Sequence, residues 1–172
     1  MQLDISIFRA LNGLAGQSVC SDAVFIFLSN YLIYIIVLAA AVLLVVWKRT
    51  WREKVKVIAI ALITSAAAYL IAAFVFHSLW PRLRPFDGLA NVNQLVGESG
   101  FSFPSRHAVF AFLLATFIFG FNKKAGWWLF VLAVLVCFGR VLVGVHYPLD
   151  VFVGAIFGTL MGWAGMVATL PS

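Results

Sequence analysis

Long apolar runs are the feature that most constrains how this chain can fold. A helix that crosses a lipid bilayer needs about 20 mainly apolar residues, within a range of about 17–25. Runs that reach or approach this length predict spanning helices at residues 24–47, 55–79, 105–121, 127–145 and 148–170. We therefore expect an all-α integral membrane protein, built as a bundle of five transmembrane helices.

Composition supports a membrane protein of one domain. The chain is 64% hydrophobic and 10% charged, whereas soluble domains are about 45–50% apolar and about 25% charged. A surface this apolar requires lipid as its solvent. The length of 172 residues predicts a single membrane-embedded domain, residues 1–172.

The N-terminal segment 3–16 has a different pattern. Ile7, Phe8, Leu11 and Leu14 recur at helical spacing, while polar residues occupy the other positions. This predicts a short amphipathic helix that lies in the membrane interface. If it inserts instead, the bundle has six spans and the N-terminus moves inside. No secretory signal peptide is expected, because no basic stretch precedes an early apolar run.

The positions of the basic residues predict the orientation. A net charge of +6 would suggest a nucleic-acid partner in a soluble protein, but here the charges crowd two short loops, as the positive-inside rule requires. These basic residues are Lys48, Arg49, Arg52, Lys54, Lys56, Lys123 and Lys124. With those loops cytoplasmic, the connections at 80–104 and around 146 face the periplasm or cell exterior, and we expect no nucleic-acid binding.

Side chains suited to phosphate chemistry gather on the predicted outward side. Arginine forks match phosphate oxygens with paired hydrogen bonds, and Arg140 lies inside an apolar run, where a charge is costly and usually functional. Ser105 and Arg106 begin a predicted helix after Pro104, where free backbone N–H groups favour an anion. The histidines and arginines on this side are His77, His107, His146, Arg82, Arg84, Arg106 and Arg140.

A histidine and a carboxylate in the last of these segments have the spacing of a catalytic pair. Asp150 lies four positions after His146, in the first turn of the helix that begins at Pro148. A carboxylate there can bond one imidazole nitrogen and leave the other free to attack phosphorus. We expect His146 to form a phosphohistidine, Asp150 to orient it, and His107 to act as general acid and then base.

The transferring phosphoryl group would be neutralised by Arg84, Arg140, Ser105 and Arg106. Two alternatives involve no chemistry. Arginines at an interface can bind lipid head groups, and a histidine such as His77 can simply be a polar side chain at head-group level. The conjunction of three such segments favours a phosphatase.

No metal or other cofactor is expected. Cys20 and Cys137 are too few soft ligands for a metal site, and a disulfide is not expected because Cys137 lies deep in an apolar run. Gly154, Gly158 and Gly162 recur every four residues, a spacing that lets helix backbones approach closely. We favour packing within the monomer for this stripe and keep a dimer face as the alternative, so the oligomeric state stays open.

The three polar segments resemble the signature of the type 2 phosphatidic acid phosphatase superfamily, which reads KxxxxxxRP, PSGH and SRxxxxxHxxxD. Arg84 and Pro85 match the end of the first motif. Pro104, Ser105 and His107 match the second, and Arg140, His146 and Asp150 match the third with the same spacing. The resemblance covers nearly the whole chain. It implies a helical bundle with these motifs on the outer side, the roles given above and no metal requirement.

The chain departs from that signature at three positions. His77 stands where the family has lysine, Arg106 replaces the glycine of the second motif, and Gly139 replaces the serine of the third. The lysine loss removes one phosphate donor. We hypothesise that Arg106 or Arg82 restores that charge; His77 is a less attractive replacement, because its charge varies with pH.

Within the family, the chain looks most like the small bacterial undecaprenyl-diphosphate phosphatases, through segments 7–14 and 143–151. That resemblance implies recycling of the undecaprenyl carrier for cell-wall synthesis. The alternatives are a phosphatase for phosphatidylglycerol phosphate, phosphatidate or a lipid A phosphate, and a non-catalytic lipid-binding or transport protein. We expect the outer loop 86–103, which carries Asp87 and Glu98, to cover the site.

Overall fold

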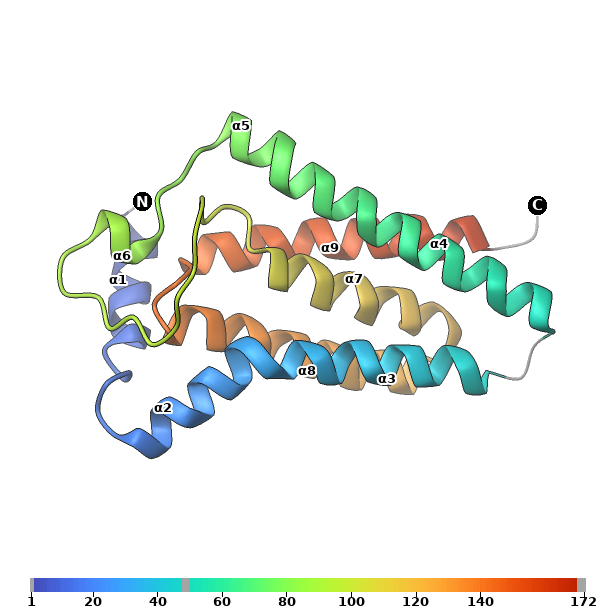
Figure 1. Ribbon diagram of the computed structural model, residues 1–172, viewed down its shortest axis with the longest axis horizontal. Coiled ribbons are helices and arrows are strands. Elements are labelled where there is room, and N and C mark those ends of the chain that lie inside the picture. Colours follow the sequence, from blue (N-terminus) through green and yellow to red (C-terminus); the bar gives the residue numbers. More distant parts are fainter. Residues whose placement is uncertain (1, 48–49, 170–172) are drawn as a thin grey trace.

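The long apolar runs of the sequence form helices that lie side by side (Figure 1). The computed structural model describes residues 2–47 and 50–169, and within these ranges it contains helices and no strand. Four helical stretches in the described ranges are long and apolar enough to cross a membrane: Val19–Val46, Trp51–Leu79, α8 (Lys123–Leu142) and α9 (Pro148–Thr169). The predicted all-helical membrane bundle is therefore confirmed.

Two of these stretches contain a wider, π-helical turn. The first consists of α2 (Val19–Ile26), η1 (Phe27–Tyr31) and α3 (Leu32–Val46). The second consists of α4 (Trp51–Leu70), η2 (Ile71–Phe76) and α5 (His77–Leu79). Such turns inside α-helices often mark functional sites, and η1 lies where α8 packs closely against it. The first stretch begins earlier than predicted because Ser18 caps it, accepting a hydrogen bond from the Ser21 N–H at 3.1 Å.

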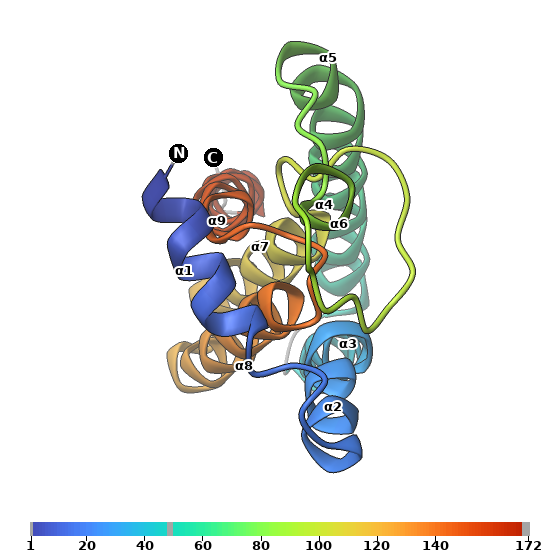
Figure 2. The ribbon, with the colours of Figure 1, turned by 90° about the vertical axis from the view of Figure 1, so that its left-hand side faces the viewer.

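A shorter helix, α7 (Arg106–Phe121), is the centre of the bundle. Its 16 residues are fewer than a usual span, and it packs against α3, α4, α8 and α9 (Figure 2). Most of its inner positions are fully buried. Because protein encloses it, its apolar side chains form the core. The prediction that five helices span the membrane remains a prediction.

The glycine stripe of α9 packs against α7. A Cβ added at Gly158 would lie 2.2 Å from the carbonyl oxygen of Val109, and one at Gly162 would lie 2.5 Å from that of Leu113. Gly154 meets the start of α7 in the same way. The favoured interpretation, packing within the monomer, is confirmed, and this face is not available to a second copy.

The N-terminal helix α1 (Gln2–Asn12) lies across one end of the bundle, over α8 and α9 (Figure 2). Phe8 is 1% exposed, and its ring centre lies 5.5 Å from that of Tyr147. Asn12 donates from Nδ2 to the Leu142 carbonyl at 2.9 Å and accepts from the Asn93 N–H at 2.9 Å. The helix is shorter than the predicted 3–16 and packs on the bundle end, and its location in the membrane interface stays a prediction.

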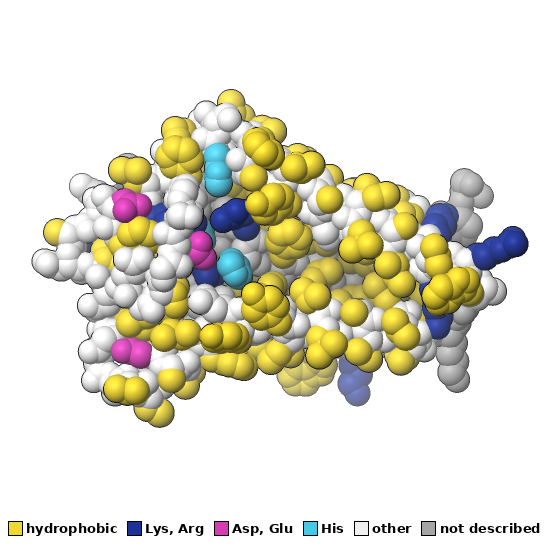
Figure 3. All heavy atoms as spheres, viewed as in Figure 1, with side chains coloured by type: hydrophobic (Ala, Val, Ile, Leu, Met, Phe, Trp, Pro, Cys, Tyr) yellow, Lys and Arg dark blue, Asp and Glu magenta, His cyan; other side chains and the backbone are white. Residues whose placement is uncertain are grey.

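The two ends of the bundle differ in character. At one end α1, α6 (Pro85–Gly88), the loop that leads to α7 and the α8–α9 connection gather (Figure 1). At the other end lie Lys123 and Lys124 at the start of α8 and the basic residues of the first turns of α4, whereas Lys48 and Arg49 lie outside the described residues. On the face seen in Figure 3, many apolar side chains lie on the surface between the two ends.

Candidate active site

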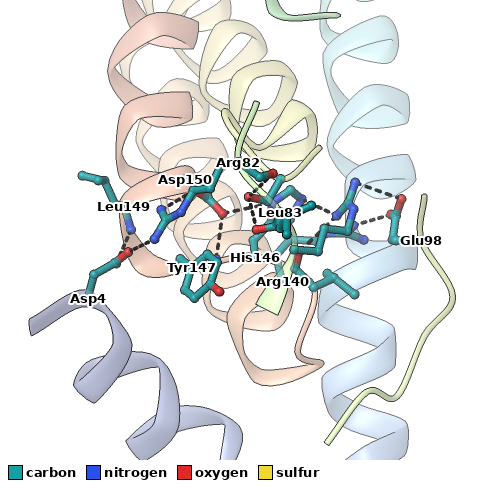
Figure 4. Close-up of polar contacts among 12 residues, drawn as sticks. Asp4, Arg82, Leu83, Glu98, Arg140, His146, Tyr147, Leu149 and Asp150 are labelled. Atoms are coloured by element: carbon teal, nitrogen blue, oxygen red, sulfur yellow. Dashed lines mark hydrogen bonds and ion pairs between the residues drawn. The ribbon is translucent and has the colours of Figure 1, made fainter. Parts of the chain in front are cut away.

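Charged and polar side chains from several segments are buried together at the end that carries α1 and α6. Figure 4 shows several of them converging from the loop after α5, from the end of α8 and from the start of α9. A charged group is buried only at a cost unless it is paired. The buried members are Arg84 and Arg140 at 1% exposure, His146 at 3%, and Ser105 and Asp150 at 0%.

Arg84 is fixed by three carbonyl groups. Its Nε donates to Gly100 at 3.0 Å, Nη1 to Val145 at 3.0 Å and Nη2 to Ser99 at 3.1 Å. Nη1 also lies 3.5 Å from Nε2 of His146. The guanidinium group is thus locked in place, with Nη1 beside that imidazole nitrogen and Nη2 3.6 Å from the Glu98 carboxylate.

The guanidinium group of Arg140, near the end of α8, is held by hydrogen bonds to η1. Its Nη1 donates to Ser29 Oγ at 3.2 Å and to Asn30 Oδ1 at 3.0 Å, both in η1. Its Nη2 pairs with the Glu98 carboxylate, and its Nε is buried without a partner. Because η1 takes both protons of Nη1, the edge formed by Nε and Nη2 is the one that can present a fork to an anion.

Close packing explains the glycine that stands where the family has serine. A Cβ at Gly139 would lie 2.6 Å from the backbone nitrogen of Ser29 and 2.8 Å from the carbonyl carbon of Leu28. A side chain at this position would push η1 away from α8. Gly139 therefore allows the approach that places Ser29 beside Arg140.

His146 lies in the α8–α9 connection, between Asp150 and Arg84. Its Nδ1 is 3.7 Å from Asp150 Oδ2, longer than a hydrogen bond, and that oxygen accepts from the Tyr147 N–H at 2.8 Å. Catalytic hydrogen bonds often shorten only in the complex with substrate. Arginine can only donate, so the contact with Arg84 assigns the lone pair to Nε2 and the proton to Nδ1, which faces Asp150.

The electrostatics of this position keep the imidazole neutral. Burial lowers the pKa of His146 to about 4; Arg140 and Arg84 act in the same direction, and Asp150 opposes them. A neutral imidazole keeps a lone pair on Nε2, the form that a nucleophilic histidine requires at neutral pH.

Three buried side-chain atoms lack a hydrogen-bond partner in the described part of the chain. They are Ser105 Oγ, Arg140 Nε and His146 Nδ1. Buried polar atoms are rarely left unpaired, so each needs an explanation. All three belong to the residues predicted from the sequence. Ser105 Oγ and Arg140 Nε are donors on separate segments of the site, as expected where an anion binds.

His107 and Arg106 lie at the edge of this group, on the first turn of α7. His107 is half-buried. Arg106 donates to the Tyr69 hydroxyl at 3.4 Å, and its charge acts on Arg84. Neither has a carboxylate partner among the described residues.

Two residues predicted as phosphate ligands have other partners in the structure. Arg82 pairs with Asp150 at 2.7 Å and with Asp4 at 2.5 Å, so its guanidinium group is engaged by two carboxylates. His77 places its ring edge-on against Phe101, with 5.7 Å between the ring centres, and makes no hydrogen bond within the described residues. Position in the sequence could not reveal either orientation.

The structure also adds residues that the sequence did not single out as site residues. Ser29 and Asn30 support Arg140, and a polar pair inside an apolar run was the available signal. Glu98, expected only to cover the site, lies within it and contacts Arg140 and Arg84 (Figure 4). Burial opposes its charge, but these arginines lower the pKa of the Glu98 carboxyl below its ordinary value, so it is ionised.

Comparisons with known proteins point to one family. Residues 57–171 match the model of the PAP2 superfamily. The chain is 38% identical to "Bacitracin transport permease protein BcrC" of Bacillus licheniformis, over 92% of this chain and 77% of the relative. It is 28% identical to "Undecaprenyl-diphosphatase BcrC" of Bacillus subtilis, over 94% and 81%. The crystal structure of the first transmembrane PAP2 type phosphatidylglycerolphosphate phosphatase from Bacillus subtilis superposes with a TM-score of 0.72 at 25% identity, covering 97% of this chain and 84% of that one.

Proposed function

Because the chain belongs to the PAP2 superfamily and is a multi-pass membrane lipid phosphatase, we propose that its substrate is undecaprenyl diphosphate, which it converts to undecaprenyl phosphate and inorganic phosphate. The name of the Bacillus subtilis relative supports this substrate. The reaction would recycle the lipid carrier of cell-wall synthesis.

The proposed reaction starts with attack by Nε2 of His146 on the terminal phosphorus. A P–N bond forms, the bond to the bridging oxygen breaks, and His107 gives its proton to the leaving oxygen. Water then attacks the phosphohistidine, with His107 taking a proton, and inorganic phosphate leaves. Asp150 holds Nδ1–H and stabilises the positive charge that develops on the ring.

Arg84, Arg140 and Ser105 hold the phosphoryl oxygens in this proposal. The observation that carries it is the pair of unpartnered donors, Arg140 Nε and Ser105 Oγ, in the same buried group as His146. The entering phosphoryl group replaces the Glu98 carboxylate at Nη2 of Arg140. Arg106, which has no carboxylate partner among the described residues, supplies the charge of the missing family lysine.

The substrate assignment is tested by measuring phosphate release in detergent from undecaprenyl diphosphate, phosphatidylglycerol phosphate, phosphatidate and a lipid A phosphate. We expect kcat/KM for undecaprenyl diphosphate to exceed the others at least about tenfold. Phosphatidylglycerol phosphate is the second candidate, because a phosphatase for that lipid shares the fold. A higher kcat/KM for any other lipid would replace the proposed substrate.

We also propose that the site faces the periplasm or cell exterior. The basic residues at the opposite end of the bundle support this orientation. Cys20, which is exposed on the first turn of α2 near the site end, provides a native probe, whereas Cys137 is half-buried within the bundle. A membrane-impermeant maleimide should label intact cells at Cys20, and a Cys20→Ser variant should lose the label. Labelling only after permeabilisation would reverse the orientation.

A further inference from the structure

The Asp150 carboxylate, fully buried beside His146, depends on a positive partner from another segment. Its Oδ2 accepts from the Tyr147 N–H and faces His146 Nδ1, while its Oδ1 accepts from Arg82 Nη1 at 2.7 Å. A carboxylate at 0% exposure would be costly without a counter-charge. Arg82 supplies that charge and also fixes the rotation of the carboxylate, because each oxygen has its own donor.

Arg82 itself is held on three sides. Nη1 meets Asp150, Nη2 meets Asp4 Oδ2 at 2.5 Å, and Cζ lies 3.8 Å from the centre of the Tyr147 ring (Figure 4). A planar guanidinium group stacked on an aromatic ring between two carboxylates has one defined orientation. Its side chain is 13% exposed, so water competes little for these contacts.

Asp4 brings the N-terminal helix into this arrangement. Its second oxygen, Oδ1, accepts from the Leu149 N–H at 2.9 Å, one of the free N–H groups in the first turn of α9. Asp4 thus binds both Arg82 and the helix that carries Asp150. It lies outside residues 57–171, which match the family model.

We infer that Arg82 and Asp4 are positioning residues for the phosphatase reaction, and this inference rests on the proposed role of His146 as nucleophile. They hold Asp150 in the rotation that faces Nδ1 of His146, so that Nε2 is directed at Arg84. The N-terminal helix is therefore part of the catalytic apparatus as well as a membrane-interface segment. Neither residue touches the phosphoryl group.

The test measures kcat and KM of Asp4→Asn, Arg82→Lys and Arg82→Gln with whichever lipid gives the highest turnover. Asp4→Asn keeps an oxygen for Leu149 but loses the charge that holds Arg82. We expect it to lower kcat about tenfold, and Arg82→Gln about a hundredfold, with KM changed less than about twofold. Arg82→Lys should recover part of the loss, because an ammonium group can still pair with Asp150. Arg9→Gln, at an exposed position of α1, is the matched control and should keep wild-type kcat.

A double-mutant cycle separates positioning from general stability. If Asp4 acts through Arg82, Asp4→Asn should cost little further kcat in the Arg82→Gln background. Unchanged kcat in Asp4→Asn, or additive losses in the cycle, would overturn the inference, even if the melting temperature falls. His146→Ala is measured in the same assay. If His146→Ala keeps its activity, the proposed mechanism is rejected. If His146→Ala is inactive and Asp4→Asn is fully active, only the positioning role is rejected.

Discussion

Replacing His146 with alanine should lower kcat for phosphate release by about 10⁴-fold or more, because the reaction loses the atom that forms the covalent intermediate. No other histidine in the described residues lies between a buried carboxylate and a buried arginine as His146 does. His107 lies on α7 and is half-buried. The measurement is phosphate release from the preferred lipid in detergent.

The same experiment should reveal the intermediate. Wild-type protein quenched during turnover of substrate labelled at the terminal phosphate should carry an acid-labile, base-stable label at His146, and His146→Ala should carry none. His146→Gln serves as a second variant, because its amide can still bond to the neighbours of the imidazole. Melting temperatures of both variants establish that they fold. Wild-type activity in a folded variant would reject His146 as nucleophile.

Replacing Arg140 with lysine should lower kcat/KM by about 10²–10³-fold, although the charge is conserved. Arg140 directs Nη1 at Ser29 and Asn30, and in the proposed mechanism its Nε and Nη2 bind the phosphoryl group. A single ammonium group cannot bond to η1 and also present a two-pronged edge to phosphate. Steady-state kinetics with the preferred lipid measures the loss.

Arg9→Lys, at an exposed position of α1, is the control for the same chemical change and should remain within about twofold of wild type. A loss below about threefold in Arg140→Lys would show that charge alone is enough and that the fork is not needed. Lysine is shorter than arginine and should fit the site. The contacts of Arg140 with η1 come from Nη1, which lysine lacks.

The residues that carry charge or chemistry were mostly predictable. Arg140 stood out because a charge in an apolar run is costly, and a spacing of four residues at a helix start is enough to bring His146 and Asp150 near each other. The all-helical fold was predictable for a related reason. In lipid the backbone must satisfy its own hydrogen bonds, so a long apolar run is a helix whatever surrounds it.

The ion pairs and hydrogen bonds between side chains of different segments could not be predicted from the sequence in the same way. Arg82 and Arg84 are two residues apart and looked equivalent as phosphate ligands, yet Arg84 faces His146 while Arg82 turns to Asp150 and Asp4. Glu98 looked like a loop residue above the site, and it lies between two buried arginines. Which partner each charge meets depends on how far apart the segments lie in space.

Sequence alone therefore determined the membrane helices, the catalytic residue types and the end of the bundle where they gather, because apolar length and local spacing are properties of single segments. Only the tertiary structure decided which residues form the proposed phosphate cradle. The contact of Gly139 with η1 brings Ser29 to Arg140, and the position of α1 across α8 and α9 brings Asp4 to Arg82. Both depend on the packing of distant segments, which sets the distances over which charges and hydrogen bonds act.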